Sequence, residues 1–174
     1  MMQGNERGPS AFLVENIGIL PKGRAFDVAM GDGRNAVYLA KAGYDVHGVD
    51  ISAEAVEAAL SLAVNVGVDI NAEVGDLENG YRIEENAYDL IVCFNYLHRP
   101  LIPQIRAGLK TGGFVVYETF IVDQAGFGRP SNPDHLLEHN ELLKMFGDFR
   151  CLCYHEGVFP GPKAVASIVA QKGA

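Results

Sequence analysis

The stretch that decides the fold is Ala25-Phe-Asp-Val-Ala-Met-Gly-Asp-Gly-Arg-Asn-Ala36, in which an apolar strand leads into two glycines and then into a helix. Glycine adopts a positive φ without steric cost and lets a ligand approach the backbone, so Gly31 and Gly33 indicate a binding loop. The first turn of the following helix presents N–H groups that have no partner within the helix. This strand, loop and helix therefore predict a ligand site at a strand end.

Strand and helix patterns alternate along nearly all of the chain that follows Gly23. We expect helices over residues 9–19, from residue 35, after residue 52, and over residues 100–109 and 140–146. The expected strands cover residues 25–30, 44–49, 70–74, 90–94, 114–120, 149–155 and 164–170, of which the last two form a hairpin. This alternation predicts an α/β protein with a doubly wound, mostly parallel Rossmann-like sheet and an antiparallel C-terminal hairpin.

Length and charge limit the classes of function. The 174 residues are enough for one domain, which we expect to span residues 1–174 with a short N-terminal helix. The net charge of −8 argues against a nucleic-acid partner, because phosphate backbones require a cationic surface. Neither a signal-type segment nor a run near the ~18 apolar residues of a membrane span is present, so we expect no membrane partner and a cytoplasmic location.

Two smaller patterns predict packing. On the helix after Ser52, the expected N-cap, four apolar residues recur with helical period and predict one buried face: Val56, Leu60, Ala63 and Val64. The three cysteines are an odd number on expected strands, which favours reduced, buried thiols over a disulfide framework or a zinc knuckle: Cys93, Cys151 and Cys153.

Acidic residues near the loop bear on the kind of ligand. Asp50 ends the second expected strand nineteen positions after Gly31, the spacing at which a carboxylate reaches a bound ribose. Asp27, Asp32 and Asp76 add negative charge, which would repel a pyrophosphate but not a sulfonium. The acids favour S-adenosylmethionine, although the glycine spacing alone also fits a dinucleotide.

These residues resemble the class I S-adenosylmethionine-dependent methyltransferases, whose first strand leads into an Asp-x-Gly-x-Gly-x-Gly loop. Here the loop is Asp27-Val-Ala-Met-Gly-Asp-Gly33, with Ala29 in place of the first glycine. Residues 33–40 and 94–100 are similar to the tellurite-resistance branch of that family. The resemblance implies S-adenosyl-L-methionine as cofactor, bound by Asp27, Ala29, Gly31, Gly33, Arg34, Asn35, Asp50, Ile51, Asp76, Leu77 and Asn95.

The segment after the fourth expected strand holds the candidate catalytic residues, beside the cofactor's methionine end. His98 is a candidate general base, with loop capping as the alternative. Tyr96 either meets the acceptor or packs, and Arg99 suits an oxyanion or carboxylate unless it forms a surface ion pair.

Three residues farther along the chain are secondary candidates. Glu118 and Thr119, at the end of the fifth expected strand, either contact the substrate or hydrogen-bond within their loop. Arg129 could supply a second cation, but a surface ion pair is the better interpretation.

A competing motif is His135-Leu-Leu-Glu-His139, which matches an inverted zinc-hydrolase pattern. Pro133 and Asp134 indicate a loop or a helix start there, and no third ligand occurs at helical spacing, so we interpret these residues as solvated and expect no metal.

The sequence thus predicts a methyltransferase that acts on a small nucleophile: a thiol, a metalloid oxyanion or a carboxylate. One alternative is a cofactor-binding module without catalysis that needs a partner chain, because the short N-terminal region leaves the pocket open or completed by a partner. A homodimer is also left open. Another alternative is an NAD-binding oxidoreductase.

Overall fold

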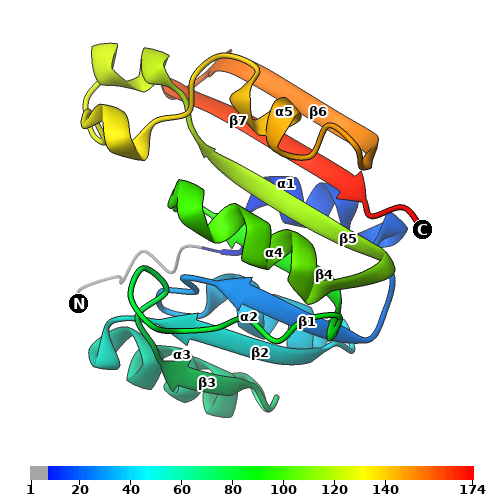
Figure 1. Ribbon diagram of the computed structural model, residues 1–174. Coiled ribbons are helices and arrows are strands. Elements are labelled where there is room, and N and C mark those ends of the chain that lie inside the picture. The colour runs from blue at the N-terminus through cyan, green and yellow to red at the C-terminus, as the bar shows by residue number, and fades with distance from the viewer. Residues whose placement is uncertain (1–7) are drawn as a thin grey trace, which may run out of the picture.

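The computed structural model describes residues 8–174 as one seven-stranded sheet with helices on both faces (Figure 1). The strand order is β3-β2-β1-β4-β5-β7-β6. Residues 1–7 lie outside the described residues. The expectation that the N-terminus carries no signal-type segment falls mostly on these residues. The strands are β1 (Arg24–Val28), β2 (Asp45–Asp50), β3 (Asn71–Val74), β4 (Tyr88–Phe94), β5 (Leu109–Phe120), β6 (Arg150–Phe159) and β7 (Lys163–Gln171).

Strand pairing confirms the predicted fold class. The first five strands pair in parallel, whereas β7 runs antiparallel to both β5 and β6. Strand β4 lies at the centre, and Leu90 through Cys93 are 0% exposed, which explains its unbroken apolar run. The chain leaves β1 for β2 on one side and reaches β4 on the other, so the sheet has a topological switch point at the carboxyl end of β1.

The helices form two layers that bury separate apolar clusters (Figure 1). On one face lie α1 (Ala11–Asn16), α2 (Arg34–Lys41) and α3 (Ala53–Val66), and on the other lie α4 (Ile102–Gly108) and α5 (Glu141–Met145). Four short 3₁₀ turns complete the chain: η1 (Ile17–Ile19), η2 (Arg99–Leu101), η3 (Val122–Gly126) and η4 (Pro133–His135). Within residues 8–174, no helix combines the length and apolar character that crossing a bilayer requires.

Helix α3 corrects the predicted apolar face. Ser52 is its N-cap as expected and accepts a hydrogen bond of 3.2 Å from the Ala55 N–H. Val56 and Ala63 are buried as predicted, but Leu60 is 40% and Val64 78% exposed, and Ala59 is buried in their place. The buried face is made of small residues because α3 packs closely on the loop before α2, where a methyl group added at Gly33 would lie 2.5 Å from the Ala59 Cβ.

The cysteines are free, as predicted, but they are not all buried. Cys93 lies in the core of β4, whereas Cys151 is exposed and Cys153 is partly exposed. The difference arises because β6 is the edge strand and carries a bulge between Cys151 and Cys153.

The contact between Gly33 and Ala59 gives a stability prediction. Gly33 has φ +80°, and an alanine there would also overlap the Ala59 Cα, at 2.9 Å. We expect Gly33→Ala to lose about 1–2 kcal/mol for the left-handed backbone and about 1–3 kcal/mol more for overpacking. Urea denaturation measures this change.

Gly67→Ala is the matched control, because Gly67 has φ +74° and a methyl group added there would meet no atom within 4 Å. Only the backbone cost applies there, so equal losses in the two variants would contradict the proposed steric contact.

Candidate functional site

A hydrogen bond joins the loop after β1 to the end of β2. The Gly31 N–H donates to Asp50 Oδ2 at 2.9 Å, and the Ser52 N–H donates to Asp50 Oδ1 at 3.0 Å. A carboxylate accepts about four hydrogen bonds. Asp50 therefore holds the loop in place and still has lone pairs for the hydroxyl groups of a ligand.

Left-handed backbone conformations gather at the same edge of the sheet. Gly31 and Gly33 have φ +57° and +80°, as their residue type suggests. Ala29 and Asn95, at the ends of β1 and β4, also have positive φ values of +51° and +57°. Residues other than glycine adopt this conformation at a cost of about 1–2 kcal/mol, and such residues cluster at functional sites. The position of Ala29 in the loop thus has the geometry that a glycine would supply without strain.

A first cavity of about 520 Å³ lies beyond the ends of β1, β2 and β3. Asp76 Oδ1 accepts the N–H groups of Glu78 and Asn79, which fixes the turn after β3. The side chain of Ile51 is apolar and 68% exposed. The cavity thus offers apolar surface between two carboxylates, and its lining residues are Ala29, Asp50, Ile51, Gly75, Asp76, Leu77, Glu78, Asn79 and Tyr96.

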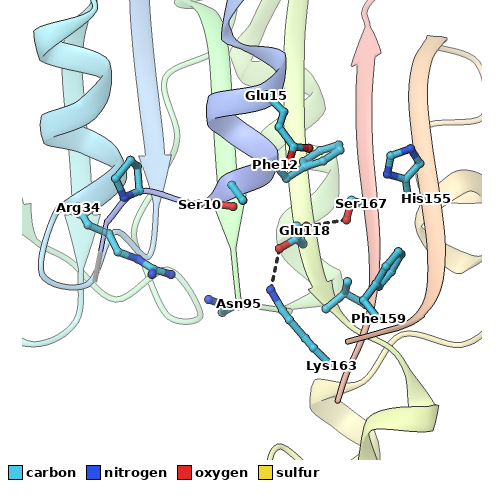
Figure 2. A pocket seen from close by; sticks show the side chains of 13 residues that line it. Ser10, Phe12, Glu15, Arg34, Asn95, Glu118, His155, Phe159, Lys163 and Ser167 are labelled. Atoms are coloured by element: carbon cyan, nitrogen blue, oxygen red, sulfur yellow. Dashed lines mark hydrogen bonds and ion pairs between the residues drawn. The ribbon is translucent and has the colours of Figure 1, made fainter. Parts of the chain in front are cut away.

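A second cavity, of about 340 Å³, lies between α1 and the β6–β7 hairpin (Figure 2). Arg34 and Asn95 lie on one side of it, and the strands β5, β7 and β6 supply the opposite wall. Its lining residues are Pro9, Ser10, Ala11, Phe12, Glu15, Arg34, Asn95, Glu118, His155, Phe159, Lys163, Val165 and Ser167.

A row of polar side chains crosses three strands beneath this second cavity. Glu118 on β5 is opposite Ser167 on β7, which is in turn opposite His155 on β6. Glu118 is 8% exposed, and it accepts hydrogen bonds from Ser167 Oγ at 2.7 Å and from Lys163 Nζ at 2.9 Å. Strand register therefore places one buried carboxylate between a hydroxyl and an ammonium group (Figure 2).

The first turn of α2 holds the N-terminal segment over the cavity. The Ser10 N–H donates to Asn35 Oδ1 at 2.8 Å, and the Arg34 guanidinium donates to the Gly8 carbonyl at 3.4 Å. Asn35 itself is buried. These contacts bring α1 above the sheet, so that Phe12 and Glu15 line the cavity.

Asp27 is the test of whether this loop fits a cationic ligand. Its carboxyl group is 2% exposed, and Oδ2 has no hydrogen-bond partner within residues 8–174. Burial raises the pKa of Asp27 to about 8, against the opposing effects of the Ala36 N–H and Arg34. A buried carboxyl oxygen without a partner suits an ammonium group, so Asp27 fits the amino group of a methionine moiety.

Several sequence candidates thus come together at one edge of the sheet. Tyr96 lines the first cavity, where its hydroxyl lies 3.4 Å from Glu78 Oε1. Burial, then the Glu78 carboxylate, raise the pKa of Tyr96, so this phenol stays protonated at neutral pH. The loop glycines Gly31 and Gly33, with Asp50 and Asp76, also lie at this edge.

The remaining candidates of that segment lie elsewhere. His98 lines a neighbouring hollow beside Pro100 and Gln104, which shares Glu78 with the first cavity, and its Nδ1 lies 4.0 Å from Glu78 Oε1. Arg99 forms a two-pronged ion pair with Glu141, at 2.6 and 2.9 Å, and also donates to the carbonyls of Asp134 and Leu136. Arg99 thus ties η2 to η4 and to the first residue of α5.

Of the three secondary candidates, one lines a cavity of this site. Glu118 lines the second cavity, but Thr119 is 1% exposed and points to the opposite face of the sheet, because successive strand residues alternate. Arg129 is exposed in the loop after η3.

The histidine motif does not form a helical pair. His135 ends η4, whereas His139 precedes α5 and bonds to Asp123 through Nε2 at 2.6 Å. Across residues 8–174, no group of three or more His, Cys, Asp or Glu side chains is placed to hold a metal ion.

Sequence reasoning missed the residues that the hairpin and α1 contribute. Phe12, His155, Phe159 and Lys163 line the second cavity, although they are far apart in the chain. Alternation along the last two strands was the available signal, but the face toward the cavity depends on the register with β5.

Comparison with known proteins decides the family. Residues 25–113, about half of the chain, match the family described as a methyltransferase domain. The chain belongs to this family. The resemblance inferred from the loop and the strand ends is therefore confirmed, as is the likeness to the tellurite-resistance branch.

Three relatives illustrate the range of this family. The chain is 27% identical to the probable S-adenosyl-L-methionine-dependent methyltransferase TehB of Haemophilus influenzae, over 84% of the chain and 52% of the relative. It is 30% identical to hemagglutinin 1 of Eikenella corrodens (78% and 46%), and 34% identical to a ubiquinone biosynthesis O-methyltransferase of a Shewanella species (55% and 43%). The chain spans about half the length of these relatives.

The solved structure of Haemophilus influenzae TehB has the same fold. It superposes with a TM-score of 0.79 at 21% identity, over 94% of this chain and 62% of the TehB chain. The methyltransferase fold therefore extends through the C-terminal hairpin, beyond the residues that match the family.

Asp27 gives a pH prediction. Because its pKa is raised to about 8 from an ordinary value of 3.8, the folded state without ligand binds the proton more tightly than the unfolded state. The contribution to stability is present below pH 4 and is lost as the pH rises towards 8. Urea titrations across this range should show the slope in the natural protein and a smaller slope in Asp27→Asn. Equal slopes would contradict the assignment.

Arg99 gives a stability prediction that separates a structural from a catalytic role. We expect Arg99→Met to lower the free energy of unfolding by about 1–2 kcal/mol, allowing for its partial exposure, because the ion pair with Glu141 and two hydrogen bonds to carbonyl groups are lost. Arg129→Met, at an exposed position, should stay within about 0.5 kcal/mol of the natural protein. An unchanged free energy of unfolding in Arg99→Met would contradict this structural role.

Proposed function

We propose that this chain is an S-adenosylmethionine-dependent methyltransferase that acts on a small molecule held in the second cavity. The observation that carries the proposal is the buried, unpartnered carboxyl oxygen of Asp27 on β1. The loop that follows β1 lies between a cavity with two carboxylates and a cavity with a polar row. One end of the cofactor would lie in each cavity, with its reactive methyl group towards the second.

Four residues of the first cavity have proposed roles in binding the adenosine end of the cofactor. Asp50 accepts hydrogen bonds from the ribose hydroxyls, and Asp76 accepts one from the adenine amino group. Ile51 and Leu77 pack against the flat base. The carboxylates of the first cavity would repel the pyrophosphate of NAD, whereas they would not repel the sulfonium of S-adenosylmethionine.

Arg34, Asn35 and Asn95 are proposed for the methionine end of the cofactor. Arg34 and Asn95 line the second cavity, and Asn35 holds the segment that covers it. The Arg34 guanidinium suits the methionine carboxylate, and Asp27 suits the ammonium group.

The cofactor supplies an activated methyl group, so the chain chiefly has to align the acceptor with it. Alignment of two reactants corresponds to effective concentrations of ~10⁵ M or more. His155 is placed to accept a proton from a protonated acceptor, in the role expected from the sequence for His98.

The acceptor class that the sequence predicts comprises thiols, metalloid oxyanions and carboxylates. The relatives named TehB and ubiquinone biosynthesis O-methyltransferase support methyl transfer to a small molecule. A cytoplasmic location, a homodimer and a completing partner chain stay predictions.

Calorimetry with S-adenosylhomocysteine tests the cofactor site. Replacing Asp50 with Ala removes charge-assisted hydrogen bonds to the ribose and should weaken binding by about 1.5–3 kcal/mol. As a control, Asp69→Ala removes an exposed acidic residue from the loop between α3 and β3. This substitution should leave the affinity for S-adenosylhomocysteine unchanged.

Heat with NAD and none with S-adenosylhomocysteine would overturn the proposal in favour of a dinucleotide enzyme. Tight binding of S-adenosylhomocysteine, with no transfer of labelled methyl to thiols, oxyanions, carboxylates or phenols, would favour a binding module without catalysis.

A further inference from the structure

The side chains that line the second cavity indicate the chemical class of the acceptor, if the proposed function holds. We propose that the acceptor is a small aromatic compound with an acidic O–H or S–H group. Its ring would pack against Phe12 and Phe159, and its ionised oxygen or sulfur would lie beside Lys163.

Apolar and aromatic side chains form a large part of the cavity wall. Phe12 comes from α1, Phe159 from the end of β6, and Val165 from β7 (Figure 2). The His155 ring meets Phe12 edge to face, with ring centroids 6.1 Å apart. Phe159 is 39% exposed, so a large apolar ring borders the cavity without being covered by the described residues. A flat apolar ligand would cover this ring and gain the stacking geometry that aromatic pairs prefer.

Lys163 is the cation that such an acceptor needs. Its Nζ donates to Glu118 Oε1 at 2.9 Å, and an ammonium group has two further hydrogens to donate. Glu118 is itself fixed by Ser167 and is nearly buried, so it acts as a positioning residue that holds Lys163 at the cavity. A nearby ammonium group stabilises an aryloxide or aryl thiolate relative to its protonated form.

Charge in the cavity is nearly balanced, which argues against a highly charged acceptor. Lys163 and Glu118 neutralise each other, Arg34 lies towards the methionine end, and Glu15 and His155 are the other titratable groups at the wall. A metalloid oxyanion has no apolar surface and would leave the exposed part of the Phe159 ring uncovered. An aromatic acceptor with one negative charge would contact both the apolar side chains and Lys163.

The transfer step balances as a simple displacement. The acceptor's O–H or S–H bond breaks, and the proton passes to His155 at the cavity wall and from there to solvent. The lone pair left on oxygen or sulfur forms the new bond to the methyl carbon. The bond between that carbon and the sulfonium sulfur breaks, and its electron pair stays on the sulfur. No oxidant or reductant is required.

Labelled S-adenosylmethionine and a panel of acceptors test this inference. Phenol, 4-hydroxybenzoate and thiophenol represent the proposed class, with 2-mercaptoethanol, selenite and tellurite as the alternatives. We expect a kcat/KM at least tenfold higher for the best aromatic acceptor than for any of the others. A higher value for a metalloid oxyanion or the aliphatic thiol would overturn the inference.

Two variants test the residues. Phe159→Ala should raise KM for the aromatic acceptor at least fivefold, and Phe159→Leu should restore part of the loss because it retains apolar bulk. Lys163→Met should lower kcat/KM at least tenfold and move the acidic limb of its pH profile upwards, while Lys163→Arg keeps the cation and much of the activity. Unchanged kinetics and pH profiles in Phe159→Ala and Lys163→Met would overturn the assignment.

Binding of S-adenosylhomocysteine separates this inference from the proposed function. A protein that binds S-adenosylhomocysteine but whose complex gives no NMR shift with any aromatic probe contradicts the aromatic acceptor alone. A protein that does not bind S-adenosylhomocysteine contradicts both. Circular dichroism of each variant checks that the hairpin has folded.

Discussion

The hydrogen bond from the Gly31 N–H to the Asp50 carboxylate is the contact on which the site depends. It joins the loop after β1 to the end of β2, at the point where the sheet changes winding direction. Asp50 can play this part only because the loop turns through left-handed conformations at Ala29, Gly31 and Gly33. The same bend that brings Gly31 to Asp50 leaves Asp27 buried behind the loop with one oxygen unpaired.

The two cavities on either side of this loop are built from different kinds of structure. The first is made by the ends of parallel strands and the turns that follow them, which are fixed by short backbone contacts to Asp50 and Asp76. The second depends on distant parts of the chain: α1, β5 and the hairpin. The two cavities are therefore held by largely separate contacts.

The C-terminal hairpin has a double role. Strand β7 completes the sheet against β5, and its residues are buried almost throughout. At the start of β7, Lys163 also lies at the cavity, where Glu118 holds it. A segment that completes the sheet thus also brings a charged side chain to the second cavity. Arg99, a sequence candidate for the acceptor site, instead ties η2 to η4 and α5.

The sequence by itself determined the order of strands and helices, the glycine loop, and the acids at the ends of β2 and β3, because these are local patterns of period, turn chemistry and spacing. It misplaced the buried face of α3, since Gly33 and Ala59 allow a close contact that periodicity does not reveal. Only the tertiary structure decided that His155, Lys163 and Phe12 share a cavity with Glu118, while His98 lies in another hollow. The physical reason is that strand register and the docking of α1 set which side chains meet across the sheet, and neither is written in any one stretch of the chain.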